Sequence, residues 1–258
     1  MTAKEDTGSV AVVTGGARGI GLGCAMALAA KGFNLALVDV IEAELKEATG
    51  KLRATGVRAE SFVADVSNFE KAEEVTKGIL ECYESISVLV NNAGIGSSKG
   101  LLEITESEWD RTIDVNLKGC FNWSRAVVPS MQDRGSGRIV NIASIAAYSG
   151  GSVSKLAYAA SKAGILGMTR SLAKELGPSI TVNAICPGVV MTPMTKMVYE
   201  RDPSLRGPRI KKTPMGREGE PEEIADLAVF LCSDKSTYIN GAVSYTHLRA
   251  HETRHDVV

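Results

Sequence analysis

Short apolar runs alternate with longer amphipathic stretches along most of this chain. The runs are rich in Val, Ile and Leu, and they predict strands at residues 10–14, 34–39, 60–66, 88–91, 138–143 and 180–185. The stretches between them predict helices at residues 20–31, 43–54, 69–84, 106–131 and 156–176. Near-continuous apolar strands separated by helices are typical of parallel strands that are covered on both faces. The pattern therefore predicts an α/β fold, a single doubly wound parallel sheet with helices on both faces, within residues 1–242.

Residues 187–219 break this rhythm with prolines, glycines and mixed charge. Long irregular segments in compact domains are usually lids or binding loops. Composition alone fits a surface excursion equally well. The segment follows the carboxyl end of a predicted strand, where such sheets bind ligands, and this position favours a substrate lid.

Bulk composition excludes several classes of protein. The chain has 258 residues, 44% of them hydrophobic, and 29 Lys and Arg against 30 Asp and Glu, for a net charge of −1. Such a balance offers no electrostatic footprint for nucleic acid or an anionic membrane. The start is polar, no apolar stretch is long enough to span a bilayer, and the five cysteines lack metal-like spacing. We expect a cytoplasmic protein with free thiols and without nucleic-acid or membrane partners.

A glycine-rich turn joins the first predicted strand to the first helix. Glycines let the backbone approach a pyrophosphate, and the following helix offers unpaired N–H groups and its positive dipole end. The spacing is G-x-x-x-G-x-G rather than G-x-G-x-x-G, so an ordinary glycine-rich turn is the alternative. The strand–turn–helix context favours a dinucleotide site at Gly15, Arg18, Gly19, Ile20 and Gly21.

Asp39 ends the second predicted strand. A carboxylate there can accept hydrogen bonds from the ribose hydroxyls of NAD, and it repels the 2′-phosphate of NADP. Arg18 weakens the preference, because a cation in the glycine turn could meet that phosphate. We therefore expect NAD as the cofactor and keep NADP as possible.

Tyr158 and Lys162 stand four residues apart in a predicted helix, and Ser144 lies upstream of them. Residues four apart project from the same helix face. An ordinary phenol has a pKa of about 10. An ammonium about 5 Å away, in an effective dielectric of about 20, favours the phenolate by about 3 kcal/mol, which is enough for acid/base work near neutral pH. The pair alone is weak evidence, because Tyr and Lys occur at this spacing by chance on many helices.

Ser144 has a rival interpretation as the nucleophile of a hydrolase. A nucleophilic serine needs a base, normally histidine. All three histidines, His247, His251 and His255, lie near the end of the chain, and no G-x-S-x-G elbow surrounds Ser144. We reject the hydrolase.

Taken together, these motifs resemble the short-chain dehydrogenase/reductase family of the classical type, whose members have a Rossmann-like fold. The resemblance runs from about residue 8 to residue 242. It rests on Thr14-Gly15 with Gly19 and Gly21, Asp65-Val66, Asn91-Asn92-Ala93-Gly94, Asp114-Val115-Asn116, Ser144, Tyr158 with Lys162, and Pro187-Gly188 with Thr192. Each motif is weak by itself, but together, in this order, they are specific.

The resemblance implies a role for each of four catalytic residues. Tyr158 passes a proton to or from the substrate oxygen as hydride moves to or from nicotinamide. Lys162 favours the ionised tyrosine and binds the nicotinamide ribose. Ser144 donates a hydrogen bond to the carbonyl oxygen. Asn116 holds a water that links Lys162 to solvent in a proton relay.

The same resemblance places further residues around the cofactor. Asp65 and Val66 flank adenine, and Asn92 lines the cofactor cleft. Val190 and Thr192, after the Pro-Gly turn, meet the carboxamide end. Tyr158 and Lys162 also belong to the cofactor site, and no metal site is expected.

The expected activity is hydride transfer between NAD(H) and a secondary alcohol or ketone. The alternative is an NADPH-dependent 3-oxoacyl-carrier-protein or acyl-CoA reductase, which residues 219–225 resemble. Asp39 argues against that alternative, and so does the lack of an arginine at residues 177–179. Lid cations (Arg206, Arg209, Lys211 and Lys212) could receive an anionic substrate, although a solvated loop is the plainer interpretation. A non-catalytic dinucleotide sensor is less favoured, because Tyr158 and Lys162 are both present.

Residues 243–258 do not resemble the family. They read like the translation of a sequencing adapter, and we expect a non-native tail there. Residues 243–248 alternate well enough to imitate a last strand. The four-residue spacing of the histidines invites a metal interpretation, which we set aside for the same reason. With an intact family-like terminus we expect a homo-oligomer, a tetramer or a dimer, and a higher melting temperature.

Overall fold

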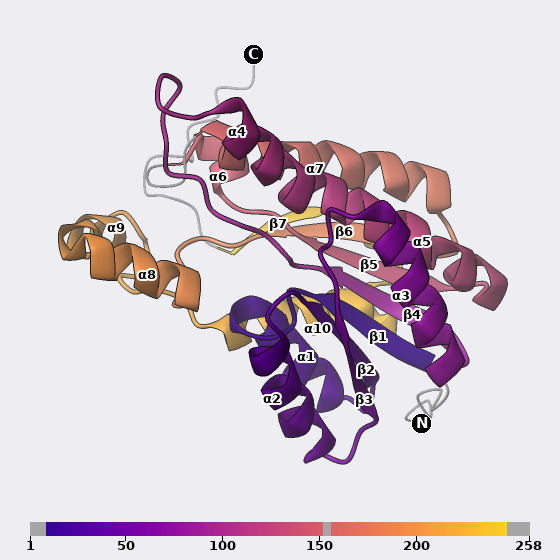
Figure 1. The fold of residues 1–258 in the computed structure, drawn as a ribbon. Coiled ribbons are helices and arrows are strands. Elements are labelled where there is room, and N and C mark those ends of the chain that lie inside the picture. The colour runs from indigo at the N-terminus through magenta and orange to yellow at the C-terminus, as the bar shows by residue number, and fades with distance from the viewer. Residues whose placement is uncertain (1–8, 152–155, 247–258) are drawn as a thin grey trace.

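The structure is a computed structural model that describes residues 9–151 and 156–246. Within them lies one parallel sheet of seven strands in the order β3-β2-β1-β4-β5-β6-β7. The strands are β1 (Ser9–Thr14), β2 (Asn34–Asp39), β3 (Ala59–Val63), β4 (Ser85–Asn91), β5 (Gly137–Ile142), β6 (Ile180–Cys186) and β7 (Val243–Tyr245). The strand order reverses between β1 and β4, and ligands bind outside the carboxyl ends of strands at such a point. The predicted fold class is confirmed (Figure 1).

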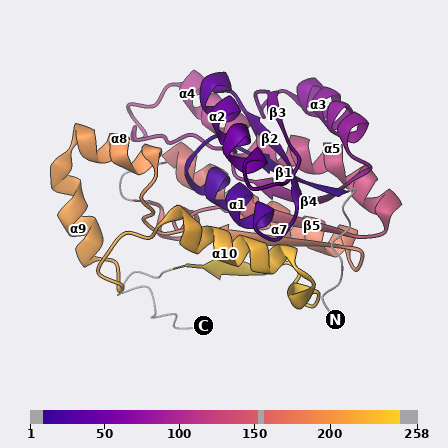
Figure 2. The same ribbon diagram turned by 90° about the horizontal axis from the view of Figure 1, so that it is seen from below.

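Helices cover both faces of the sheet, and each face has its own buried core (Figures 1 and 2). One layer contains α1 (Gly19–Ala29), α2 (Glu42–Arg53) and α10 (Pro221–Cys232). The other contains α3 (Phe69–Cys82), α4 (Glu106–Ile113), α5 (Gly119–Arg134) and α7 (Leu156–Leu176). Leu28 of α1 and Ile224 of α10 both belong to the first core, and Trp123 lies fully buried in the second. Burial of this apolar area is the main stabilising contribution to such a fold.

Two predicted elements differ from the observed ones. Strand β3 ends at Val63, whereas the apolar run predicted residues 60–66. Ala64 and Val66 lie in the loop after the strand but are buried in the same core, so apolar character alone could not mark the strand end. The predicted helix 106–131 is interrupted by a π-helical segment, η1 (Asp114–Lys118), between α4 and α5. Such wide turns are often found at functional sites.

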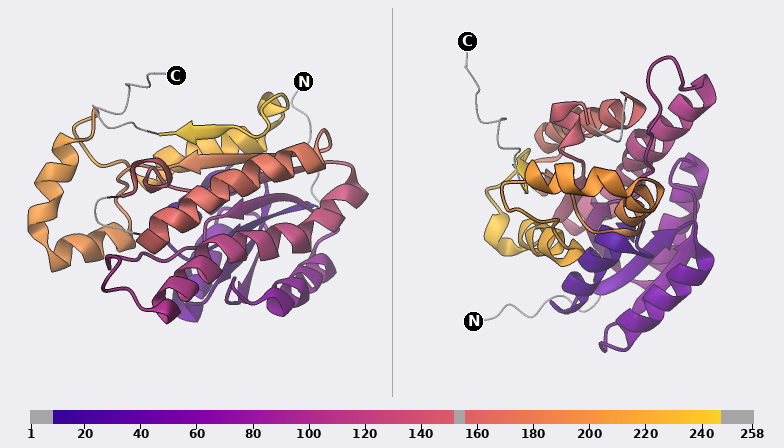
Figure 3. Two further views of the ribbon diagram at one scale, coloured as in Figure 1. Left: turned by 90° about the horizontal axis from the view of Figure 1, so that it is seen from above. Right: turned by 90° about the vertical axis from the view of Figure 1, so that its left-hand side faces the viewer.

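The lid segment is helical rather than irregular. It contains α8 (Pro193–Arg201), η2 (Pro203–Leu205) and α9 (Arg206–Lys211), and none of their described residues is buried. Pro193 and Pro203 open two of these elements, at positions where the missing N–H has no helical partner in any case. The prolines therefore start helices here. Figure 3 shows that the unit stands out from the body of the domain.

Strand β7 pairs in parallel with Ala184–Cys186 of β6, so the start of the tail does take the place of a last strand. The Gly188 N–H donates to Thr246 Oγ1 at 3.3 Å. His247, His251 and His255 lie outside the described residues. Among the described residues, no helix combines the length and apolar content needed to cross a membrane.

Candidate active site

The predicted catalytic lysine is a buried ammonium beside the predicted catalytic tyrosine. Lys162 and Tyr158 occupy the first turns of α7, and Lys162 Nζ lies 5.7 Å from the centroid of the Tyr158 ring. Lys162 is only 3% exposed, and its Nζ donates to the Ile142 carbonyl oxygen at 2.7 Å. Ser144 follows Ile142 by two residues, so the end of β5 supplies both the acceptor for the ammonium and the serine.

Lys162 has hydrogen-bonding capacity left over. An ammonium has three donors. Within residues 9–151 and 156–246, Ile142 is the one acceptor that it bonds, and no carboxylate pairs with it. Burying a charge is costly unless it is paired and hydrogen-bonded. The site therefore fits a ligand or water that brings oxygen acceptors to Lys162, as a ribose does.

Asn116, in η1, fastens the loop after β4 to α7. Its Oδ1 accepts from the Ile95 N–H at 2.8 Å, and its Nδ2 donates to the Ile95 carbonyl and to Ser161 Oγ, both at 3.0 Å. Ser161 Oγ in turn donates to the Tyr158 carbonyl at 2.7 Å. The Asn116 side chain is thus used inside the protein, and its predicted water-holding role stays a prediction. Sequence reasoning missed Ser161, although its place between Tyr158 and Lys162 was a signal.

Gly94 leaves the space beside these groups open. A Cβ there would lie 3.3 Å from Asn116 Oδ1 and 3.5 Å from Lys162 Nζ. The distance to Asn116 Oδ1 is tight, and the distance to Lys162 Nζ is an ordinary van der Waals contact, so a side chain here would fill the space beside both groups. The absence of a side chain keeps room for a ligand next to the ammonium.

The glycine turn presents an open helix end. Helix α1 begins at Gly19, without a side-chain cap and without an acidic residue in its first turn. Gly19 has a positive φ of 57°, and a Cβ on Gly21 would lie 2.1 Å from the Gly15 carbonyl oxygen. Unpaired N–H groups at a helix start bind anions, so this turn fits the pyrophosphate of a dinucleotide.

The Asn92 side chain holds this turn by hydrogen bonds to its main chain. Its Nδ2 donates to the carbonyl oxygens of Thr14 and Gly15, at 3.1 and 3.0 Å. Thr14 Oγ1 accepts from the N–H groups of Asn92 and Ala93, at 3.1 and 3.2 Å. The structure therefore shows Asn92 shaping the turn, whereas the family resemblance placed it only along the cleft.

Asp39 is held by the main chain at the end of β2. Its Oδ2 accepts from the Ala17 N–H at 3.1 Å, and its Oδ1 accepts from Val40 and Ile41 at 2.8 and 3.2 Å. The neighbouring Arg18 reaches across to Glu44 of α2, at 3.2 Å. The carboxylate is thus oriented next to the glycine turn, and the arginine is already paired.

The residues predicted to flank adenine lie in the loop after β3. Asp65 accepts from Ser67 and pairs with Arg111 at 2.9 Å. Partial burial raises the pKa of Asp65, but the hydrogen bonds from Ser67 and Arg111 outweigh it and hold the pKa below its usual value. Val66 is buried, and its carbonyl accepts from Asn122 Nδ2 at 2.9 Å. These partners fix the loop that would form one wall of an adenine site.

The residues predicted to meet the carboxamide lie where the chain leaves the body for the predicted lid. We call the two paired segments at Val190 and Gly219 the strap. Val190 is buried and bridges to Gly219, with N–H···O bonds of 2.8 and 2.9 Å between the two segments. Thr192 caps α8 by accepting from Thr195, and a Cβ on Gly19 would lie 3.5 Å from Thr192 Cβ. The start of the predicted lid therefore adjoins the glycine turn.

Glu218, on the same strap, is a residue that sequence reasoning missed. It is only 8% exposed and pairs with Arg206 of α9, at 3.0 Å. Burial raises the pKa of Glu218, and the hydrogen bonds from Arg206 and its own main chain outweigh that and lower it. No local sequence pattern marks a pair whose members stand twelve residues apart along the chain.

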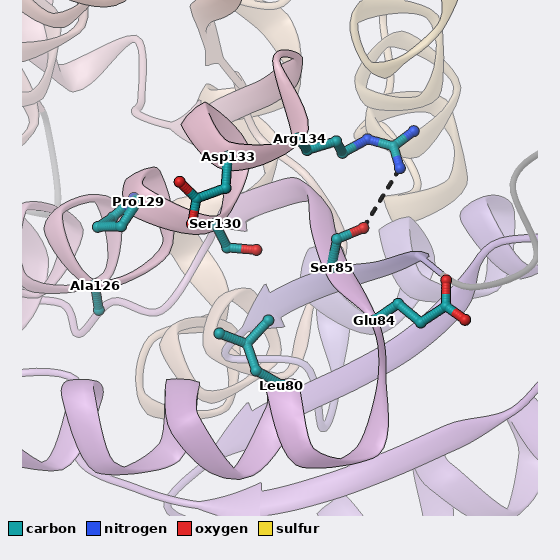
Figure 4. A pocket seen from close by; sticks show the side chains of 8 residues that line it. All are labelled: Leu80, Glu84, Ser85, Ala126, Pro129, Ser130, Asp133 and Arg134. Carbon is teal, nitrogen blue, oxygen red and sulfur yellow. Dashed lines mark hydrogen bonds between the residues drawn. The ribbon is translucent and has the colours of Figure 1, made fainter.

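A separate hollow lies between α3 and α5, far from these residues (Figure 4). It is lined by Leu80, Glu84, Ser85, Ala126, Pro129, Ser130, Asp133 and Arg134. Ser85 begins β4, so the hollow sits at the amino ends of the strands. It contains none of the motif residues. Across the described parts of the chain, no group of three or more His, Cys, Asp and Glu side chains could hold a metal ion.

Comparison with known proteins gives the family. Residues 15–247 match the family model described as "Enoyl-(Acyl carrier protein) reductase". The 3-oxoacyl-[acyl-carrier-protein] reductase FabG of Thermotoga maritima is 38% identical, over 92% of this chain and 95% of that protein. The (2S)-[(R)-hydroxy(phenyl)methyl]succinyl-CoA dehydrogenase subunit BbsD of Thauera aromatica is also 38% identical, over 92% of this chain and 94% of that one.

A solved structure agrees with these sequences. The crystal structure of an actinorhodin polyketide ketoreductase variant with NADPH superposes with a TM-score of 0.87 at 33% identity, over 92% of this chain and 95% of that one. The fold, the sequence motifs and the matched relatives all indicate the same family. The chain therefore belongs to the short-chain dehydrogenase/reductase family and is an NAD(P)-dependent oxidoreductase.

Proposed function

We propose that this oxidoreductase interconverts a secondary alcohol and a ketone, with NAD(H) as the hydride carrier and Tyr158 as the general acid/base. The observation that carries the proposal is the buried Lys162 ammonium, which lies beside the Tyr158 ring with one protein acceptor and space next to Gly94. A cation in this place can stabilise the negative charge that develops on the Tyr158 oxygen during proton transfer, and it offers donors to a ribose.

Each catalytic side chain has a distinct task. The Tyr158 phenolic oxygen gives its proton to the substrate oxygen during reduction and takes it back during oxidation. Ser144 Oγ already accepts from the Ala146 N–H at 3.1 Å, so its own hydrogen is available to donate to the substrate oxygen. The cofactor supplies or accepts the hydride. Lys162 and Asn116 hold the water through which the tyrosine proton is exchanged with solvent.

We propose NAD rather than NADP as the preferred cofactor. Asp39, oriented by three main-chain N–H groups, can accept from a ribose 2′-hydroxyl and repels a 2′-phosphate. Gly15, Gly19, Ile20 and Gly21 receive the pyrophosphate. Asp65 and Val66 flank adenine, and Val190 and Thr192 meet the carboxamide.

A second candidate function is NADPH-dependent reduction of a 3-oxoacyl thioester on a carrier protein or coenzyme A. Two relatives support it by their names, the FabG reductase and subunit BbsD of the (2S)-[(R)-hydroxy(phenyl)methyl]succinyl-CoA dehydrogenase. The matched ketoreductase was solved with NADPH. Arg201, Lys211 and Lys212 are exposed on the lid and offer positive charge to an anionic thioester carrier. Asp39 argues for NAD and so against the NADPH version.

We propose that residues 187–219 close over the substrate. A hollow at the root of this lid is lined by Met191, Lys196, Tyr199, Glu200 and Arg206. We also propose a cytoplasmic homo-oligomer, a tetramer or a dimer. The exposed side chains of Phe121 on α5 and Leu156 on α7 support a contact between copies.

The test is a parallel assay of ketones, alcohols and 3-oxoacyl thioesters with NADH and NADPH. Tyr158→Phe should lower turnover by about 10³-fold while dinucleotide binding persists. Unchanged turnover in that variant would leave the enzyme without its assigned acid/base. The absence of turnover by the unaltered protein with every substrate and both cofactors would instead favour a non-catalytic sensor. A clear preference for NADPH would refute the assignment of Asp39.

A further inference from the structure

The glycine turn carries a charge pair whose position bears on the choice between NAD and NADP. Arg18 directly follows Ala17, whose N–H donates to Asp39 Oδ2. The exposed Arg18 side chain extends to α2, where its Nη1 donates to Glu44 Oε1 at 3.2 Å. Within residues 9–151 and 156–246, Glu44 is the one carboxylate that pairs with Arg18. The pair is therefore attached to the chain one residue after the N–H that orients Asp39, the carboxylate that would receive the adenosine ribose.

Glu44 differs from the other glutamates of its helix. Glu42 and Glu47 pair along α2 with Lys46 and Lys51, each four residues further on. The residue four positions after Glu44 is Ala48, so no such partner exists on the helix. Glu44 pairs instead with the glycine turn.

The second oxygen of Glu44 is an independent observation. Glu44 Oε2 is buried and has no hydrogen-bond partner among the described residues. The Glu44 side chain as a whole is 41% exposed, so solvent screens part of its charge, and Arg18 is its one ion-pair partner among the described residues. Together with Asp39, Glu44 gives this corner two carboxylates against the single Arg18 guanidinium.

We propose that Glu44 is a specificity-determining residue that makes the chain prefer a 2′-hydroxyl to a 2′-phosphate on the adenosine ribose. This inference rests on the proposed use of a dinucleotide at Asp39. Glu44 keeps the Arg18 guanidinium paired, and a guanidinium is the group that best binds phosphate. A 2′-phosphate entering this corner meets two carboxylates and an arginine that is already occupied.

The test compares two adenosine fragments that need no turnover. Isothermal titration measures binding of adenosine 5′-monophosphate and of adenosine 2′,5′-bisphosphate to the full chain. Glu44→Gln should raise the affinity for the bisphosphate relative to the monophosphate by about tenfold, because it removes one charge near the phosphate and releases Arg18. Glu42→Gln and Glu47→Gln are matched controls on the same helix and should leave the ratio within about twofold.

A second variant tests whether Glu44 acts through Arg18. In an Arg18→Gln background, Glu44→Gln should lose most of its effect on the ratio. A ratio that Glu44→Gln leaves unchanged would overturn the inference, and so would an effect that persists in full without Arg18. Weak binding of both fragments and of NAD to the unaltered protein would instead refute the proposed function itself.

Discussion

The glycine turn with the Lys162 site and the lid are built in opposite ways. Around the turn and Lys162, the side chains of Asn92, Asn116 and Asp39 make several hydrogen bonds each. Lys162 and Asn116 are also buried. In the lid helices α8 and α9 no described residue is buried. The lid is joined to the body by the strap at Val190 and Gly219 and by the Arg206–Glu218 pair. The residues predicted to carry the family's chemistry are thus held by many hydrogen bonds, whereas the segment proposed to select the substrate makes fewer contacts with the body and is freer to differ.

The largest expected effect lies in the rigid region. Lys162→Met keeps the length of the side chain and removes the ammonium, so we expect kcat/KM to fall by about 10³-fold or more. The melting temperature should not fall, because a buried charge is replaced by an apolar group. Steady-state kinetics and calorimetry measure both. Lys174→Met, at an exposed position on the same helix, is the control and should keep full activity; an equal loss there would show that helix α7 itself is disturbed.

A smaller effect is expected from filling the glycine turn. Gly21→Ala places a Cβ against the Gly15 carbonyl and should weaken dinucleotide binding by about 100-fold and lower stability by about 2 kcal/mol, because the turn must open. Gly50→Ala is the matched change in a helix where a Cβ meets nothing within 4 Å, and it should raise stability by about 0.8 kcal/mol. Titration with NAD measures the effect of each variant on binding, and thermal unfolding measures its effect on stability. Unaltered NAD binding in Gly21→Ala would contradict the assignment of the turn.

The smallest effect is expected in the lid. Glu218→Gln removes the charge that holds Arg206, so KM should rise by about fivefold while kcat and the affinity for NAD stay unchanged. Glu222→Gln, an exposed change on α10, should alter neither constant. A fall in kcat with constant KM would show that the strap positions the cofactor rather than the lid.

The lowered pKa of Glu218 predicts how KM depends on pH in the unaltered protein and in Glu218→Gln. The folded-state pKa of Glu218 is lowered, with burial opposing and Arg206 favouring the carboxylate. The stabilisation by the pair is therefore complete above the ordinary carboxyl pKa of 4.5 and is lost as the pH falls through the lower folded pKa. KM should rise in acid in the unaltered protein and stay flat in Glu218→Gln.

Local pattern was enough for the regular elements of the fold. The predicted ranges 34–39 and 156–176 coincide with β2 and α7, because apolar spacing marks strands and helices that pack against a core. The lid was predicted as irregular, which was wrong, because Pro193 and Pro203 start helices there. Helix α10 was not predicted as a helix, although Pro221 in its first turn and the Glu220–Glu223 capping box were both readable signals.

By itself, the sequence determined the fold class, the family and the catalytic candidates, because these depend on periodicity and on short motifs whose members stand close together along the chain. Only the tertiary structure decided which long-range partners those residues have. It paired Arg18 with Glu44, 26 positions apart, and it bonded the Asn92 side chain to the Gly15 carbonyl of the glycine turn, 77 positions away. Such contacts form where separate elements meet at the carboxyl edge of the sheet, and one-dimensional spacing carries no information about that meeting.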